Sequence, residues 1–171
     1  FLLVADTLHA LQALAAAHRS HFNIPVIGIT GSNGKTIVKE WLNQLLEPDF
    51  AVVRSPRSYN SQIGVPLSVW LMEARHKVAI FEAGISRNGE MKALQKVIRP
   101  TIGVFTNLGS AHSEGFYSME EKLQEKWALF STAEVIVYKR GNPIVDDFVA
   151  DNCLTQPLFS WGIDDISNMQ V

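Results

Sequence analysis

Several features are scarce in this sequence, and each scarcity excludes a class of protein. Cys153 is the one cysteine among 171 residues, so no disulfide can form within the chain and a reducing cytoplasm is the expected compartment. No apolar run reaches the roughly 20 residues of a membrane-spanning helix. The apolar opening of residues 1–17 is interrupted by Asp6 and lacks the basic start of a signal peptide.

The sequence also lacks a large excess of positive or negative charge, internal repeats and an initiating methionine. The net charge is −2, which provides no basic field for nucleic acid or for an anionic membrane. With 47% hydrophobic residues, the chain has the composition and length of one well-packed domain. Because the sequence does not begin with methionine, we expect it to belong to a longer protein.

Short apolar runs alternate with amphipathic segments along the chain. The first segment is predicted to be a helix capped at Asp6 or Thr7, with apolar positions Leu8, Leu11, Leu14, Ala15 and His18. Further helices are predicted at 35–46, 65–73, 88–98, 118–130 and 143–149, and strands at 26–30, 51–53, 78–82, 101–106, 135–138 and 158–161. Strands that are apolar on both faces and are followed by helices predict an α/β fold with a mostly parallel sheet flanked by helices. Ligands in such folds bind beyond the carboxyl ends of the strands.

A glycine-rich loop, GITGSNGKT at positions 28–36, connects the strand predicted at 26–30 to the next helix. Its expected nucleotide contacts are Gly31, Ser32, Asn33, Gly34, Lys35 and Thr36. Backbone N–H groups of such a loop cradle phosphates, while Lys35 would neutralise them and the Thr36 hydroxyl would hold Mg²⁺. Ile29 stands where the strict pattern has its first glycine, so a plain glycine-rich turn is the alternative.

Two potential metal ligands follow other predicted strands. Glu82 ends the apolar run 78–81, and His112 follows the strand predicted to end near Asn107. Both are therefore expected at the sheet edge where the glycine-rich loop lies, and a carboxylate there suits Mg²⁺. Taken singly, Glu82 could cap a loop and His112 could be a packing residue. Their combination with the loop favours a metal site.

Lys126 occupies an unusual position on the helix predicted at 118–130. Ser118 and Glu121 form a capping pattern at its start, and the apolar stripe of this helix is Met119, Leu123, Trp127 and Phe130. Lys126 projects into that stripe. It could extend its ammonium out of the apolar face to solvent, or be held in a site where its pKa is lowered and it becomes reactive.

Together these segments resemble the Mur ligase superfamily, and within it the UDP-N-acetylmuramoyl-tripeptide:D-alanyl-D-alanine ligases. The matching segments are ITGSNGKT at 29–36, NSQIGVPL at 60–67, FEAG at 81–84 with GE at 89–90, and TN at 106–107 with AH at 111–112. The spacing from His112 through Ser118 to Lys126 matches as well, and the likeness extends from Asp6 to about Val149. The family also has isoleucine or alanine at the position of Ile29, but usually has a second asparagine where this chain has Ser61.

The resemblance implies a P-loop NTPase-like central domain and roles for single residues. The implied catalytic residues are Lys35, Asn60, His112 and Lys126, and the implied metal ligands are Thr36, Glu82 and His112. Lys35 and Thr36 would hold ATP and a first Mg²⁺, and His112 with Glu82 would bind a second. Lys126 would be the lysine that CO₂ carbamylates, and Asn60 would lie near the γ-phosphate.

The resemblance also implies a reaction, its partners and a domain plan. The carboxylate of a UDP-linked muramoyl tripeptide would attack the γ-phosphate of ATP, and the amine of D-Ala-D-Ala would then displace phosphate. Residues 1–22 would be a linker helix from an N-terminal domain, and 23–171 an ATP-binding central domain, incomplete at its C-terminal end. The enzyme would be bacterial and cytoplasmic, without nucleic acid or membrane insertion. The segment RSPRSY at 54–59 resembles ligases fused to an alanine racemase.

Three other functions fit parts of the sequence. A folylpolyglutamate synthase-like ligase shares the loop and the lysine, although residues 6–11 and 60–67 favour the peptidoglycan branch. A P-loop kinase would fit the loop but would not call for His112 and Lys126. A non-catalytic nucleotide-binding module would bind ATP without hydrolysing it.

Overall fold

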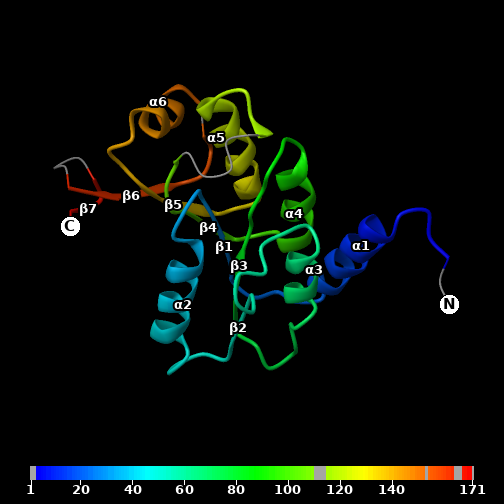
Figure 1. Ribbon diagram of the computed structural model, residues 1–171. Coiled ribbons are helices and arrows are strands. Elements are labelled where there is room, and N and C mark those ends of the chain that lie inside the picture. Colours follow the sequence, from blue (N-terminus) through cyan, green and yellow to red (C-terminus); the bar gives the residue numbers. More distant parts are fainter. Residues whose placement is uncertain (1–2, 110–114, 153, 164–166, 171) are drawn as a thin grey trace.

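The protein folds around one parallel sheet with helices on both faces (Figure 1). The computed structural model describes residues 3–109, 115–152, 154–163 and 167–170. The strands are β1 (Val26–Thr30), β2 (Val52–Arg54), β3 (Val78–Glu82), β4 (Ile102–Phe105), β5 (Val135–Lys139), β6 (Leu158–Gly162) and β7 (Met169–Gln170). They lie in the order β2-β3-β1-β4-β5-β6-β7, and every neighbouring pair is parallel. The α/β prediction is confirmed.

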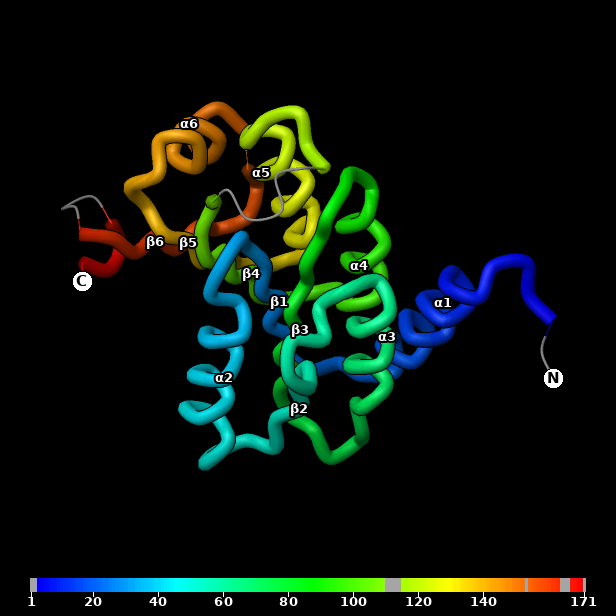
Figure 2. Tube along the Cα trace, in the orientation of Figure 1, coloured from blue at the N-terminus to red at the C-terminus, as the bar shows by residue number. Residues whose placement is uncertain are grey.

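The helices divide unequally between the two faces of the sheet. They are α1 (Thr7–Arg19), α2 (Lys35–Leu46), α3 (Gly64–Val69), α4 (Glu90–Ile98), α5 (Met119–Trp127) and α6 (Pro143–Asp151), with the 3₁₀ helix η2 (Ala128–Phe130). On one side α2 packs over β1 and β3, whereas α1, α3, α4, α5 and α6 lie on the other side (Figures 1 and 2). Of the helices described, none is long and apolar enough to cross a membrane.

The larger hydrophobic core lies on the five-helix side. Fully buried side chains from the sheet, such as Phe81 and Ile136, pack there against Leu94 of α4 and Phe130 of η2. Each such side chain stabilises the fold by about 1.5–3 kcal/mol relative to an exposed one. This core fixes the strand order, and with it the positions of the loops that leave the carboxyl ends of the strands.

The helix predicted at the start of the chain is confirmed, but its buried face differs from the predicted apolar stripe. Asp6 caps it by accepting a hydrogen bond from the backbone N–H of His9 (2.7 Å). Leu8 and Leu14 are 37% and 54% exposed, and the buried positions are Gln12, Ala15 and Arg19. Nε of Arg19 donates to the Ile98 carbonyl oxygen at the end of α4 (2.9 Å). The inward face of α1 is therefore partly polar, because Arg19 hydrogen-bonds a backbone carbonyl at the end of α4.

Several element boundaries differ from the predicted ones. The helix predicted at 65–73 ends at Val69, because Leu71 and Met72 donate to carbonyls three residues earlier. The helix predicted at 118–130 changes at its end into η2. The two-residue strand β7 was not predicted. Apolar periodicity does not distinguish α from 3₁₀ turns, and so short a strand carries no pattern.

The strand order places three loops side by side. β1 lies between β3 and β4, and Ile29 of β1 is in register with Glu82 of β3 and Val104 of β4. Because the strands are parallel, the loops that follow all three leave at the same edge. The glycine-rich loop and Glu82 therefore share this edge, as predicted, and the Thr106–Asn107 segment lies beside them. His112, which was predicted at the same edge, lies outside the described residues.

Candidate functional site

The glycine-rich loop is held in shape by the residues that follow β4. The Thr106 hydroxyl donates to the Asn33 carbonyl oxygen (2.6 Å). Asn107 accepts twice, from the Asn33 N–H through Oδ1 (3.0 Å) and from the Ser32 N–H through its backbone oxygen (2.9 Å). These contacts fix the loop before any nucleotide binds. The TN motif at 106–107 therefore holds the glycine-rich loop in its conformation.

Gly31 is expected to be the least replaceable residue of this loop. Its φ is +140°, and an added Cβ would collide with the Thr106 hydroxyl and lie 3.0 Å from the Asn107 nitrogen. Gly31→Ala should therefore lower the free energy of unfolding by about 2–4 kcal/mol, from steric overlap and backbone strain together. Gly34→Ala is the matched control, since Gly34 has φ +80° but nothing within 4 Å of the added Cβ. Urea unfolding that gives equal losses for both variants would contradict this account.

Lys35 and Lys126 converge on one carbonyl of the loop. Lys35 Nζ donates to the Gly31 oxygen (2.8 Å) and the Ser32 oxygen (3.2 Å), and Lys126 Nζ donates to the same Gly31 oxygen (3.3 Å). Lys126 is only 2% exposed. Burial first, then the charges of Lys35 and Lys122, lower the pKa of Lys126 to about 7. Burial also lowers the pKa of Lys35.

Helix α5 carries a second buried lysine that the sequence analysis missed. Lys122 lies one turn before Lys126, and its Nζ donates to the Gly109 oxygen (2.6 Å) beside the loop. The predicted cap is confirmed, because the Ser118 hydroxyl accepts from the Glu121 N–H (3.1 Å). The four-residue spacing between the two lysines was the available signal. A helix with both lysines on its inward face directs two amine groups to the site.

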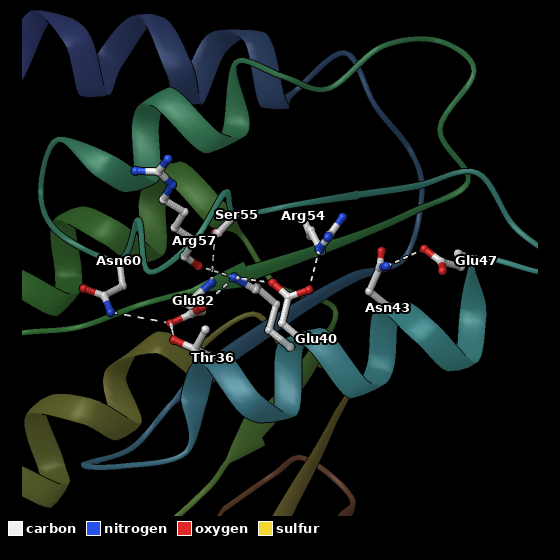
Figure 3. A network of polar contacts seen from close by, with 10 residues as sticks. Thr36, Glu40, Asn43, Glu47, Arg54, Ser55, Arg57, Asn60 and Glu82 are labelled. Atoms are coloured by element: carbon white, nitrogen blue, oxygen red, sulfur yellow. Dashed lines mark hydrogen bonds and ion pairs between the residues drawn. The ribbon is translucent and has the colours of Figure 1, made fainter.

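Glu82 is the centre of a polar network between three elements (Figure 3). Its side chain is fully buried at the end of β3. Oε2 accepts from the Thr36 hydroxyl of α2 (3.0 Å) and lies 3.5 Å from Nδ2 of Asn60, in the segment between β2 and α3. The structure therefore brings together Glu82, Thr36 and Asn60, which were singled out from separate parts of the sequence.

The other oxygen of Glu82 contacts Lys39, a residue that sequence reasoning overlooked. Lys39 Nζ lies 2.9 Å from Oε1 of Glu82 and 3.1 Å from Oε1 of Glu40, and it donates to the Arg57 carbonyl oxygen. The Lys39 side chain is fully buried. Its position one turn after Lys35 on the same helix was a usable signal, since residues four apart share a helix face.

Thr36 and Glu82 could hold a magnesium ion. Mg²⁺ is bound by oxygen, typically through one or two protein ligands completed by water and phosphate. The adjacent hydroxyl and carboxylate fit this demand, and no group of three or more His, Cys, Asp or Glu side chains suited to a metal occurs within the part of the chain that the structure describes. His112 lies outside the described residues, so its role as a second ligand stays a prediction.

A cavity of about 440 Å³ opens beside the two lysines. Lys35 and Lys126 line one part of it, and Asn60, Arg87 and Glu90 contribute further polar groups. Small-molecule sites commonly have volumes of about 300–1,000 Å³. The arrangement can place an anionic group of a substrate next to phosphates held by the loop.

Comparison with known proteins identifies relatives of this chain. Residues 29–165 match the protein family described as the Mur ligase middle domain. The UDP-N-acetylmuramoyl-tripeptide–D-alanyl-D-alanine ligase of Treponema pallidum is 41% identical over 129 residues, which are 75% of this chain and 28% of that protein. The ligase of the same name from Bacillus subtilis is 34% identical over 158 residues, 91% of this chain and 34% of the relative.

Among solved structures, the MurF ligase of Thermotoga maritima in complex with ADP superimposes with a TM-score of 0.85 at 28% identity. The match covers 95% of this chain and 38% of that one. The chain thus spans roughly a third of the length of the relatives that it matches.

Proposed function

Because the chain belongs to the Mur ligase family, whose middle domain it contains, we propose that the full-length protein is an ATP-dependent peptide ligase. It would add D-Ala-D-Ala to a UDP-N-acetylmuramoyl tripeptide, releasing ADP and phosphate. The observation that carries this proposal is the convergence of Lys35, Thr36, Glu82 and Lys126 at one sheet edge beside a cavity. The solved relative bound to ADP supports ATP as the nucleotide.

The proposed reaction has two steps. A carboxylate oxygen of the tripeptide bonds to the γ-phosphorus while the bond to ADP breaks, which forms an acyl phosphate. The amine nitrogen of D-Ala-D-Ala then bonds to the acyl carbon, phosphate leaves, and the amine loses a proton. In both steps anionic groups approach one another, so stabilisation of charge is the main task of the site.

The residues of this chain would divide that task. Lys35, now bonded to two loop carbonyls, would turn to the β and γ phosphates. Asn60, whose Nδ2 lies 3.5 Å from Oε2 of Glu82, would orient the transferred phosphoryl group. Thr36 and Glu82 would hold Mg²⁺, which supplies positive charge next to the phosphates. The cavity beside Lys126 would admit the carboxylate end of the peptide.

We propose further that Lys126 is carbamylated in the full-length enzyme. Its pKa of about 7 leaves much of the amine neutral near neutral pH, and only the neutral amine attacks CO₂. The ammonium first loses one proton; the neutral amine nitrogen then bonds to the CO₂ carbon as one C–O π bond opens, and a second proton is released, so a cation becomes an anion. Lys35 and Lys122, whose charges oppose an ammonium at this position, would stabilise a carbamate there.

The domain plan is also a proposal, in which residues 1–22 link to an N-terminal domain and 23–171 belong to a central domain that continues further. The α2 side of the molecule supports it. The outer face of α2 exposes Ile37, Trp41 and Leu45 by 55%, 63% and 73%. On the same side of the sheet, Phe159 of β6 is 39% exposed. Apolar patches of this kind mark surfaces that another segment covers.

Ligation assays on the full-length protein and on residues 1–171 test this function. The full-length protein should release phosphate from ATP only when UDP-N-acetylmuramoyl tripeptide is present, and should form the pentapeptide when D-Ala-D-Ala is added. Residues 1–171 should form no product, because the segments that bind the UDP moiety and the amine lie elsewhere in this proposal. Activity with folate and glutamate would instead support the folylpolyglutamate synthase alternative. ATP binding without phosphate release would support the non-catalytic module.

Two finer points complete the proposal. The bacterial relatives support a bacterial enzyme, and we place it in the cytoplasm, where its nucleotide-linked substrates would be made. The segment 54–59 suggested a fused alanine racemase. Assaying the full-length protein for alanine racemisation tests that fusion directly.

A further inference from the structure

Lys39 is a fully buried side chain of the network around Glu82 that the proposed reaction does not use. Its ammonium is fully enclosed, with Glu82, Glu40 and the Arg57 carbonyl oxygen as partners. A buried ammonium is costly unless it is paired, and here it is paired with an equally buried carboxylate. The pair therefore lies inside the protein, next to the surface where the nucleotide is proposed to bind.

Lys39 divides the two oxygens of Glu82 between two tasks. Oε1 lies against Lys39 (2.9 Å), whereas Oε2 accepts from Thr36 (3.0 Å) and is near Asn60 (3.5 Å) (Figure 3). The charge on Oε1 is thus neutralised by Lys39 from the protein interior. Oε2 lies beside Thr36, the other proposed metal ligand. A carboxylate held in this way can offer a cation a single oxygen.

The segment that carries Asn60 is tied to the same ammonium. Arg57, whose carbonyl accepts from Lys39, lies three residues before Asn60 and has a φ of +49°. Ser55 of the same segment accepts from the Glu82 N–H through its hydroxyl (3.2 Å). Lys39 therefore links the carboxylate to the segment that brings Asn60 beside it.

We infer that Lys39 is a positioning residue that acts as an internal counter-ion of Glu82, confines a divalent cation to Oε2 and weakens the binding of that cation. The inference rests on the proposed function, because the cation would be the Mg²⁺ of the nucleotide. Two positive charges that share one carboxylate repel each other across a poorly screened interior. The lysine would keep Glu82 paired when the cation leaves, and would lower the affinity enough for the metal to be released with ADP.

The sign of the effect separates this role from a purely structural one. If Lys39 merely supports the fold, its removal should loosen the site and weaken metal binding. If it is a counter-ion that competes with the metal, its removal should leave a buried carboxylate that binds the cation more tightly. Lys39→Met, close in volume and uncharged, is the informative variant, and Lys39→Arg keeps the charge.

The experiment measures Mn²⁺ binding to the full-length protein with ADP, from the free Mn²⁺ signal in electron paramagnetic resonance. Lys39→Met should bind Mn²⁺ roughly tenfold more tightly than the unmodified protein, and Lys39→Arg should stay near it. Weaker or unchanged Mn²⁺ binding by Lys39→Met would overturn the inference. If the unmodified protein neither binds Mn²⁺ with ADP nor forms the ligation product, the proposed function itself has failed.

Thermal unfolding keeps the test decisive if Lys39→Met folds poorly. Mg²⁺ without nucleotide should raise the melting temperature of Lys39→Met by several degrees more than that of the unmodified protein, because the metal replaces the lost charge. The double variant Lys39→Met with Glu82→Gln has no carboxylate to neutralise, so it should fold and show no extra stabilisation by Mg²⁺. Failure of both variants to fold, or equal stabilisation of both by Mg²⁺, would show a structural role instead.

Discussion

Replacing Lys126 by alanine in the full-length enzyme is expected to lower kcat by on the order of a hundredfold or more, since one preorganised charge of the reaction site is lost. Lys126 is enclosed beside the loop carbonyl that Lys35 also contacts. A carbamate there would be an anion within reach of the metal and phosphate site. Steady-state phosphate release at saturating ATP and peptide measures the loss.

Chemical rescue identifies the cause of that loss. Acetate or another short carboxylic acid should restore part of the activity of Lys126→Ala, because it fills the gap with a carboxylate. Lys122→Ala is the matched control, since it removes a neighbouring buried lysine of the same helix and leaves the Lys126 side chain in place. Acetate should not restore it. Near-normal rates in Lys126→Ala would leave Lys126 as a structural lysine.

Lys126 should also make the stability of residues 1–171 depend strongly on pH. In the folded state its pKa is about 7, against an ordinary value of 10.5. Below pH 7 both states carry the proton, so the folded state bears the full cost of a buried ammonium. As the pH rises from 7 to 10.5, the Lys126 amine loses its proton in the folded state but keeps it in the unfolded state. The free energy of unfolding should therefore increase over this window, by about 3–5 kcal/mol in total.

Lys126→Met is the variant that isolates this effect. In CO₂-free buffer it should be more stable than the unmodified chain at pH 6, by a few kcal/mol, and this advantage should shrink towards pH 10. Urea unfolding at several pH values gives both curves. Adding bicarbonate at pH 8.5 should stabilise the unmodified chain alone, because only its lysine can form a carbamate. A stability difference that is independent of pH would mean that Lys126 stays charged when folded.

The sequence alone was sufficient for the fold class and for much of the candidate site. Alternating strand and helix patterns predicted the parallel sheet, and its geometry then required the loop at 28–36 and Glu82 to share an edge. Helical periodicity likewise predicted that Lys126 points inward. These features are encoded locally, because the period of an element sets which side chains face the interior. The position of His112 was predicted in the same way, and this residue lies outside the described residues.

Only the tertiary structure decided which groups pair across elements. Lys39 lies on α2 and Glu82 on β3, and nothing in either segment specifies their ion pair until β1 and β3 are adjacent. The same holds for Thr106 and Asn107, which fix the loop from β4, and for Arg19, which turns the inner face of α1 polar. Strand order and helix docking result from packing of the whole core, whereas periodicity describes one element at a time. The sequence therefore determined the elements and the edge of the sheet that carries the candidate site, and the packing of the core determined the partners of each charge.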